Sequence, residues 1–175
     1  MNLIAAVDMN WAIGKQDELL FRIRTDLRRF KELTRDNIVI CGRRTVQTFP
    51  GGKPLAGRIN LILSRQHDLD IEDAIMCRDQ DELFAELNRL NFEGYDDSQI
   101  YVIGGASIYK LLMPYCSKAL ITYIHASVED ADCHLPDFGR LTNWIMQDKS
   151  EIMSENSIEF EYRTYINPDP ETWHI

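Results

Sequence analysis

The chain has 175 residues, 45% of them hydrophobic and 27% charged, which fits a single globular domain with a substantial core. No apolar run is long enough to span a membrane, and the N-terminal residues lack the basic region of a signal peptide. Four widely spread cysteines, Cys41, Cys77, Cys116 and Cys133, form no CxxC pair, so we expect reduced thiols in a cytoplasmic protein. Because no apolar patch exceeds the needs of the core, we expect a monomer.

The net charge of −9 is distributed unevenly along the chain. The segment from residue 37 to residue 67 holds five basic residues and no acidic one, which leaves 14 basic against 28 acidic residues elsewhere. The five basic residues are Arg43, Arg44, Lys53, Arg58 and Arg65. Such an island suits a small polyanion, whereas the acidic remainder would repel nucleic acid. A chance grouping of solvated charges is the alternative at this point.

The N-terminal half alternates strands and helices. Short apolar runs predict buried strands at residues 3–8, 37–41 and 59–63. An irregular loop from Met9 to Arg24 follows the first of these strands, and a short helix over residues 43–49 follows the second. The segment 79–94 has leucines on one face, Asp at its start and Gly at its end, which predicts an amphipathic helix.

The C-terminal half ends in consecutive strands. Residues 99–128 are typical of a strand, a glycine pair, a helix, a proline stop and a further strand. Two alternating runs, residues 143–153 and 158–166, predict an antiparallel pair. The order of elements predicts an α/β fold with a central mixed sheet, mostly parallel with an antiparallel C-terminal edge, flanked by helices. We expect one domain over residues 1–166 and a loosely held tail over residues 167–175.

One carboxylate has an unusual position in the helix that follows the loop. Thr25 is expected to N-cap this helix, which places Asp26 in the first turn, and the helix is expected to end near Thr34. Asp26 lies four residues before Phe30 and therefore shares the apolar face of the helix. The simpler explanation is that an acid at a helix start offsets the macrodipole. The other explanation is that Asp26 belongs to a binding site.

Two junctions between a strand and a helix suit a phosphate group. The pair Gly104-Gly105 opens a helix directly after a strand, which permits close approach of a ligand and exposes unpaired helix N–H groups. The segment from Cys41 to Thr45 (CGRRT) repeats this pattern with two arginines and a hydroxyl. Together the two junctions suggest a site for a dinucleotide, although the GxGxxG motif of an ordinary Rossmann site is missing. A tight turn without a ligand is the alternative for the glycine pair taken alone.

The acidic segment 129–137 (EDADCHLPD) contains the residue types of a metal site. Metal ligands usually come from defined spacings in more than one segment, and no partner motif occurs, so we expect an acidic surface loop and no metal. The other histidines, His67, His125 and His174, have no nucleophile motif around them, which argues against a hydrolase triad.

Several of these motifs together resemble the dihydrofolate reductase family. The resemblance covers LIAAVDMNWAIG, TDLRRFKELT, IVICGRRTVQTFPGGKPLAGRINLILS, YVIGGASIYKLLMP and LITYIHASVEDADCHLPDF, in this order and over most of the chain. It implies the mixed sheet of that family and its reaction, the reduction of 7,8-dihydrofolate to 5,6,7,8-tetrahydrofolate with NADPH, which supplies one-carbon metabolism. The partner that it implies is this small-molecule substrate, with neither nucleic acid nor a membrane.

On the substrate side, the resemblance implies that Asp26 hydrogen-bonds the N3 and 2-amino edge of the pterin, because two carboxylate oxygens can accept from two N–H donors. Thr122 is implied to support this contact, so that Asp26 and Thr122 form the catalytic pair. Arg58 is implied to bind the α-carboxylate of the glutamate tail in a bidentate geometry. The other substrate-binding residues that the resemblance implies are Ile4, Ala5, Leu19, Leu27, Phe30, Lys31, Phe49, Lys53, Leu55 and Ile103.

The resemblance also implies an NADPH site around the two strand-to-helix junctions. Arg43, Arg44 and Thr45 match the helix start that holds the phosphates, and Ser64 with Arg65 matches the segment that receives the 2′-phosphate. The other implied cofactor residues are Ala6, Ile13 and Tyr109 near the nicotinamide, Gly104, Gly105 and Ala106 at the turn beneath the pyrophosphate and nicotinamide, and Gly14, Gly42, Leu63, Ile103, Ser107 and Ile108.

The implied reaction is hydride transfer from nicotinamide C4 to pterin C6 with protonation of N5. Asp26 would lie at the far edge of the pterin from N5, so we expect it to orient the ring and raise the basicity of N5, with water as the proximate proton donor. The loop from Met9 to Arg24 is implied to act as a lid that excludes bulk water.

The chain departs from the family pattern in three places. Leu20-Phe21 stands where many relatives have Pro-Trp, and phenylalanine lacks the indole N–H that reaches a water near the pterin. The segment FPGGKPL is one residue longer than in many relatives, which suggests a wider groove around the benzoyl-glutamate. Ser107 stands where some relatives have an arginine, so recognition of the 2′-phosphate is expected to rest on Arg43 and Arg65.

Three other functions are compatible with part of these features. A reductase of riboflavin biosynthesis has the same fold and cofactor, but gives no reason for Asp26 and Arg58 to match a folate site together. A non-catalytic NADPH- or folate-binding module and a basic-patch nucleic-acid binder do not require Asp26, Phe30, Arg58, the glycine pair and Thr122 in one chain. We therefore expect an active dihydrofolate reductase.

Overall fold

The computed structural model describes residues 1–16, 18–66, 68 and 70–174. Three residues named or included in the predictions lie outside the described residues. They are Asp17 in the expected lid, His67 among the histidines and Ile175 at the end of the tail. Among the helices of the described ranges, none is long and apolar enough to cross a membrane.

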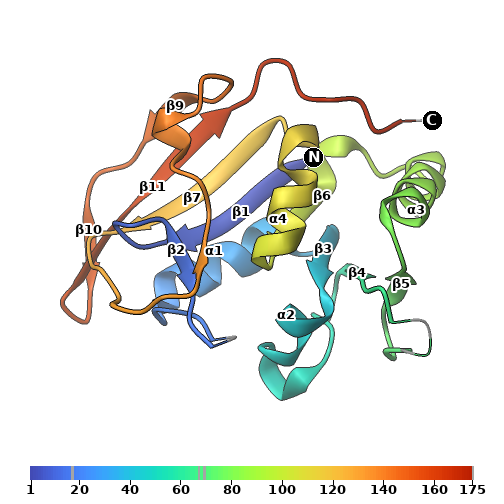
Figure 1. Ribbon diagram of the computed structural model, residues 1–175, viewed down its shortest axis with the longest axis horizontal. Coiled ribbons are helices and arrows are strands. Elements are labelled where there is room, and N and C mark those ends of the chain that lie inside the picture. The colour runs from blue at the N-terminus through green and yellow to red at the C-terminus, as the bar shows by residue number, and fades with distance from the viewer. Residues whose placement is uncertain (17, 67, 69, 175) are drawn as a thin grey trace.

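The regular elements follow the predicted order (Figure 1). The α-helices of the described part are α1 (Arg24–Thr34), α2 (Arg43–Gln47), α3 (Gln80–Phe92) and α4 (Ala106–Leu112). Strands β1 to β6 are Asn2–Val7, Ala12–Gly14, Ile38–Gly42, Ile59–Leu63, Ile75–Cys77 and Ile100–Gly104. Strands β7 to β11 are Lys118–Ile124, Cys133–His134, Ile145–Lys149, Met153–Glu155 and Ile158–Ile166.

The main sheet of the described residues has nine strands, in the order β10-β11-β7-β1-β6-β3-β4-β5, with β9 also paired to β11. All neighbours from β7 to β5 are parallel, and β11 is antiparallel to β7, β9 and β10. The predicted mixed sheet, mostly parallel with an antiparallel C-terminal edge, is therefore confirmed.

Side chains of both faces of this sheet are buried, as is usual where helices cover a parallel sheet. Leu3 and Ile38 belong to the larger core cluster, which includes residues of α3 and α4. Their neighbours in sequence, Ile4 and Val39, point to the other face and pack in a second cluster that includes residues of α1 and α2. Figure 1 shows α4 in front of the sheet. The helix α1, which carries Asp26, therefore lies on the opposite face from α4.

Two predictions of local structure are wrong. Thr25 is not the N-cap of α1, because the helix begins at Arg24 and its N-cap is Ile23, which provides no side-chain cap. The run 143–153 is not one strand: β9 and β10 pair separately with the long strand β11. Ser150 lies between them and exchanges hydrogen bonds with the backbone of Tyr162, which interrupts the pairing.

Three short strands lie where no strand was predicted. The strand β5 adds to the edge of the sheet beside β4. The strand β2 lies in the segment expected to be an irregular loop, and it pairs with β8, which lies in the expected acidic surface loop (Ala12 with His134, Gly14 with Cys133). Because each of these strands has only two or three residues, no periodicity in the sequence marks it.

The C-terminal tail is docked, contrary to the expectation of a loosely held segment. Trp173 is buried and its ring centroid lies 6.0 Å from that of Phe84 in α3. The backbone N–H of Glu171 donates to the carbonyl of Pro114 at 2.9 Å, and the side chain of Asn167 donates to the carbonyl of Cys116 at 3.2 Å. The division into a domain and a tail stays a prediction.

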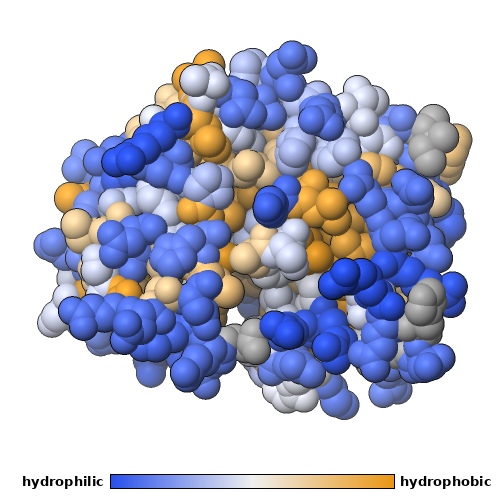
Figure 2. Space-filling model, in the orientation of Figure 1, coloured by the Kyte–Doolittle hydropathy of each residue, from blue (hydrophilic) through white to orange (hydrophobic). Residues whose placement is uncertain are grey.

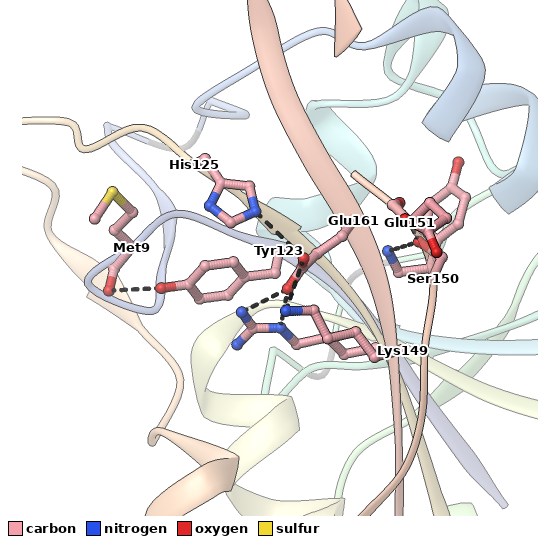
Figure 3. A network of polar contacts seen from close by, with 9 residues as sticks. Met9, Tyr123, His125, Lys149, Ser150, Glu151 and Glu161 are labelled. Atoms are coloured by element: carbon pink, nitrogen blue, oxygen red, sulfur yellow. Dashed lines mark hydrogen bonds and ion pairs between the residues drawn. The ribbon is translucent and has the colours of Figure 1, made fainter. Parts of the chain in front are cut away.

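A cluster of charged side chains surrounds a buried carboxylate on the face of β7 and β11 that is opposite to α1. Glu161 of β11 is 0% exposed, and both Nε and Nη2 of Arg163 lie 2.6 Å from its Oε1. Nζ of Lys149 lies 3.1 Å and Nε2 of His125 lies 3.4 Å from its Oε2, and Figure 3 shows both side chains directed at this carboxylate. Burial raises the pKa of Glu161, but contacts with Arg163 and Lys149 outweigh it and hold this pKa below its ordinary value.

Candidate active site

The structure brings Asp26 and Thr122 together from positions 96 residues apart. Asp26 lies in the first turn of α1, and Thr122 lies on β7, between Ala6 of β1 and Tyr162 of β11 in the register of the sheet. The Thr122 hydroxyl donates to Oδ1 of Asp26 at 2.6 Å. Among the described residues, no group donates to Oδ2 of Asp26, so this carboxylate has unused acceptor capacity.

Burial raises the pKa of Asp26 above its ordinary value. The hydrogen bond from Thr122 and the positive charge of Arg29 act in the opposite direction without cancelling this effect. The Asp26 carboxyl therefore keeps its proton to a higher pH than an ordinary aspartate. Raised carboxyl pKa values in pockets are typical of sites that bind or transfer protons.

The predicted apolar wall of the substrate site forms one packed group. Its members lie on β1, α1, β6 and the segment around the Pro50–Gly52 turn, and they are Ile4, Phe30, Phe49, Leu55 and Ile103. Two further predicted residues, Leu19 and Leu27, are 50% and 42% exposed. Large apolar side chains left exposed to solvent suit a ligand with an aromatic ring.

Arg58 is held against the C-terminal end of α1. Its Nε and Nη2 donate to the hydroxyl of Thr34 at 3.2 and 3.1 Å, Nη2 donates to the carbonyl of Lys31 at 3.1 Å, and Nη1 donates to that of Ala56 at 2.7 Å. Burial and then the nearby charge of Arg35 lower the pKa of Arg58. The anchored guanidinium has a fixed orientation, whereas Lys31 and Lys53 are exposed.

A cavity of about 820 Å³ opens between the β2 segment and α2, where the face shown in Figure 2 is hollowed. Every predicted cofactor residue lines it, namely Ala6, Ile13, Gly14, Gly42, Arg43, Arg44, Thr45, Leu63, Ser64, Arg65, Ile103, Gly104, Gly105, Ala106, Ser107, Ile108 and Tyr109. Of the predicted substrate residues, Ala5, Leu19 and Ile103 also line the cavity, and the others do not.

One end of this cavity is basic, with Arg43, Arg44 and Arg65 in its wall. Helices α2 and α4 both begin at the wall without a side-chain cap, so their first N–H groups are available. At the start of α4, Gly104 has φ of 117°, and a Cβ there would lie 3.2 Å from the Tyr109 ring. The hydroxyl of Tyr109 donates to the carbonyl of Ile4 at 2.7 Å and so fixes this ring beside the turn.

Sequence reasoning missed Glu18, Thr48, Gln66 and Cys133, which also line the cavity. Thr48 lies four residues after Arg44, so helical spacing predicts that both residues lie on the same face. Cys133 reaches the cavity only because β8 pairs with β2, and no local pattern marks that pairing.

The expected lid is tied to the segment that follows β7. The Asp8 carboxylate accepts from the backbone N–H groups of Asn10, Ala12 and Val128 at 2.8, 2.9 and 3.0 Å. The Gln16 N–H donates to Oδ2 of Asp132 at 3.0 Å, next to the pairing of β2 with β8. These contacts place Ile13 and Gly14 in the cavity wall.

The comparisons with known proteins agree with this geometry. The family model described as dihydrofolate reductase matches residues 1–167. A dihydrofolate reductase of Mycobacterium leprae is 30% identical over 94% of this chain and 96% of its own length. A bifunctional dihydrofolate reductase-thymidylate synthase of Glycine max is 32% identical over 94% of this chain, which spans 33% of that relative's length.

A solved structure gives the same result for the fold. The dihydrofolate reductase from Enterococcus faecalis, complexed with NADP(H) and RAB-propyl, superimposes with a TM-score of 0.82 over 96% of both chains at 27% identity. Sequence and structure therefore show that this chain belongs to the dihydrofolate reductase family.

Proposed function

We propose that this chain catalyses the NADPH-dependent reduction of 7,8-dihydrofolate to 5,6,7,8-tetrahydrofolate. The observation that carries the proposal is the partly buried carboxylate of Asp26, held by Thr122 beside a large cavity with a basic end. Membership of the family supports the same reaction.

In this proposal, Asp26 accepts hydrogen bonds from N3 and the 2-amino group of the pterin, while Thr122 keeps its carboxylate in position. The apolar group around Phe30 and Phe49 covers the ring, and Arg58 binds the α-carboxylate of the glutamate tail. The anchored guanidinium suits this role because its orientation is set before the ligand arrives.

NADPH, when bound, supplies the hydride. We assign Arg43, Arg44 and Arg65 to its phosphates, and the start of α4 with Tyr109 to the nicotinamide end of the cavity. The chain itself orients the pterin through Asp26 and excludes water through the β2 segment, which is paired with β8. Asp26 lies at the edge of the pterin away from N5, so water delivers the proton to N5.

We further propose that the chain acts as a cytoplasmic monomer. Burial raises the pKa of the thiols of Cys41, Cys77 and Cys116 to about 12, so these thiols stay protonated and are poor nucleophiles, as in a protein without disulfide bonds.

The experiment is NADPH oxidation with dihydrofolate, measured for the wild-type chain and for Asp26→Asn. We expect turnover by the wild type and a loss of about 10²- to 10³-fold in kcat at neutral pH for the variant, the range for removing one preorganised electrostatic contact. Glu32→Gln is the matched control, since Glu32 is an exposed acid on the same helix, and its turnover should equal that of the wild type.

Tight NADPH binding without turnover of dihydrofolate would overturn the proposal in favour of a binding module. Turnover of a ribosylaminopyrimidine instead would favour the riboflavin-type reductase. Full activity of Asp26→Asn would show that Asp26 is only a carboxylate at a helix start.

A further inference from the structure

The start of α1 lacks the local cap that a helix normally has. The first N–H groups of a helix have no acceptor within the helix, and a side chain at the N-cap usually supplies one. Here the N-cap is Ile23, with φ of −101° and ψ of 113°, and its side chain cannot accept. Because Asp26 lies in this first turn, fraying of the turn would displace the carboxylate of the candidate active site.

The missing acceptors come from Glu155, about 130 residues away on β10. Its Oε1 accepts from the Arg24 N–H at 2.7 Å, and its Oε2 accepts from the Thr25 N–H at 3.0 Å and from the Thr25 hydroxyl at 2.6 Å. The hydrogen bond from the Thr25 hydroxyl, followed by those from the two N–H groups, holds the pKa of Glu155 below its ordinary value. The carboxylate is therefore charged at neutral pH, the form that also favours the positive end of a helix dipole.

The strand that carries Glu155 is fixed in a tight hairpin. Glu155 pairs with Ile158, and the two residues between them, Asn156 and Ser157, have φ of 52° and 64°. Positive φ at both central residues is typical of a two-residue hairpin turn, which sets the register of its strands. The position of the Glu155 carboxylate is therefore determined by the sheet and not by α1.

The same hairpin contacts α1 at a second point. Tyr162 of β11 lies directly opposite Thr122, and Cζ of Arg29 lies 3.9 Å from the centroid of its ring. Burial, and then the charge of Asp26, raises the pKa of Tyr162, and Glu155 acts in the same direction while Arg29 opposes them. Asp26 and Glu155 thus both lie near the ring of Tyr162.

We propose that Glu155 is a positioning residue of the substrate site, which caps α1 from the β10–β11 hairpin and thereby holds Asp26 against Thr122. The inference rests on the proposed function, because it assigns the carboxylate of Asp26 to the pterin. We expect the effect of Glu155 to fall mainly on the substrate side, because Arg43 and Arg44 lie on α2 and Arg65 lies just after β4, far from the β10–β11 hairpin in the strand order of the sheet.

The experiment compares Glu155→Ala and Glu155→Gln with the control Glu159→Ala, an exposed acid on β11. For Glu155→Ala we expect kcat/KM for dihydrofolate to fall by about 3- to 30-fold, the range for loss of a helix cap, with KM for NADPH within about twofold of wild type. Glu155→Gln retains one acceptor oxygen and should recover about half of this loss on a logarithmic scale.

The pH profile supplies a second readout. The groups around Asp26 are Thr122 on β7, Arg29 on α1, Tyr162 on β11 and Glu155 on β10. A frayed first turn would hydrate Asp26, so the inflection of kcat that depends on Asp26 should move to lower pH in Glu155→Ala. A merely structural role for Glu155 would lower the amount of folded enzyme without moving this inflection.

Equal losses for dihydrofolate and NADPH, an unmoved inflection, or Glu155→Ala behaving like Glu159→Ala would each overturn the inference. The rate of amide hydrogen exchange at Arg24 and Thr25 tests the cap independently of the proposed function. Faster exchange of both amides in Glu155→Ala supports the cap even if the wild type does not reduce dihydrofolate, and unchanged exchange refutes it.

Discussion

Asp26 is a partly buried and Glu161 a fully buried carboxylate, they lie on opposite faces of β7 and β11, and their surroundings differ. Glu161 lies opposite Tyr123 on β7 and has Arg163, Lys149 and His125 within 3.4 Å. Asp26 contacts Thr122, the residue before Tyr123 on β7. Its partners are the Thr122 hydroxyl and the more distant charge of Arg29. The pKa is lowered at Glu161 and raised at Asp26.

The difference shows that burial alone does not determine the state of a carboxylate. Where cations surround it, as at Glu161, the charged form is compensated and the cluster fixes the packing of β7, β9 and β11. The guanidinium of Arg163 also lies 3.5 Å from the centroid of the Tyr123 ring. The Tyr123 hydroxyl in turn donates to the Met9 carbonyl, so the cluster is connected to the first residue of the expected lid (Figure 3). Where the negative charge is only partly compensated, as at Asp26, a ligand with N–H donors can provide the missing hydrogen bonds.

The largest effect on folding should come from Glu161→Gln. Arg163 is only 16% exposed and would lose a charged hydrogen-bond partner, so we expect the free energy of unfolding to fall by about 2 kcal/mol. Asp26→Asn should leave it unchanged or raise it slightly, since an incompletely compensated charge is removed. Urea denaturation measures both, and equal destabilisation by the two variants would contradict the comparison.

A smaller effect, on activity, should come from Thr122→Val, which keeps the shape of the side chain and removes the donor to Asp26. We expect about a tenfold loss of kcat/KM for dihydrofolate, the value of one hydrogen bond to a charged group. The pKa of Asp26 should rise further, because the hydrogen bond from Thr122 lowers it. Steady-state kinetics across pH measure both quantities, and an unchanged inflection would show that Thr122 does not act on Asp26.

The smallest effect should appear in the pH dependence of stability, with opposite signs for the two carboxylates. A lowered pKa stabilises the fold above the ordinary pKa, so the deficit of Glu161→Gln should be complete at neutral pH and shrink below about pH 4.3. A raised pKa destabilises the fold as pH rises past the ordinary value, so the advantage of Asp26→Asn should grow above about pH 3.9. Urea midpoints at several pH values test this, with at most about 1.4 kcal/mol per pH unit expected from either group. The same sign for both variants would contradict the assigned shifts.

The sequence by itself determined the elements that local physics specifies. The helix α3 has its N-cap Asp79, whose side chain accepts from the Glu82 N–H, and its leucines are buried as their spacing predicts. The apolar runs became β1, β3 and β4, and the two strand-to-helix junctions became the cavity wall. The position of Asp26 in the first turn of α1 was predicted correctly, although the residue expected to cap this turn was not its N-cap.

Only the tertiary structure decided which distant segments meet. The pairing of β2 with β8, the docking of Trp173, the cap from Glu155 and the cations around Glu161 join residues that carry no local sign of one another. Helix and strand periodicity extends over a few residues, whereas these contacts depend on the order and register of the whole sheet. The chain order thus predicted a fold and a family, and the sheet decided which carboxylate is compensated and which is available to a ligand.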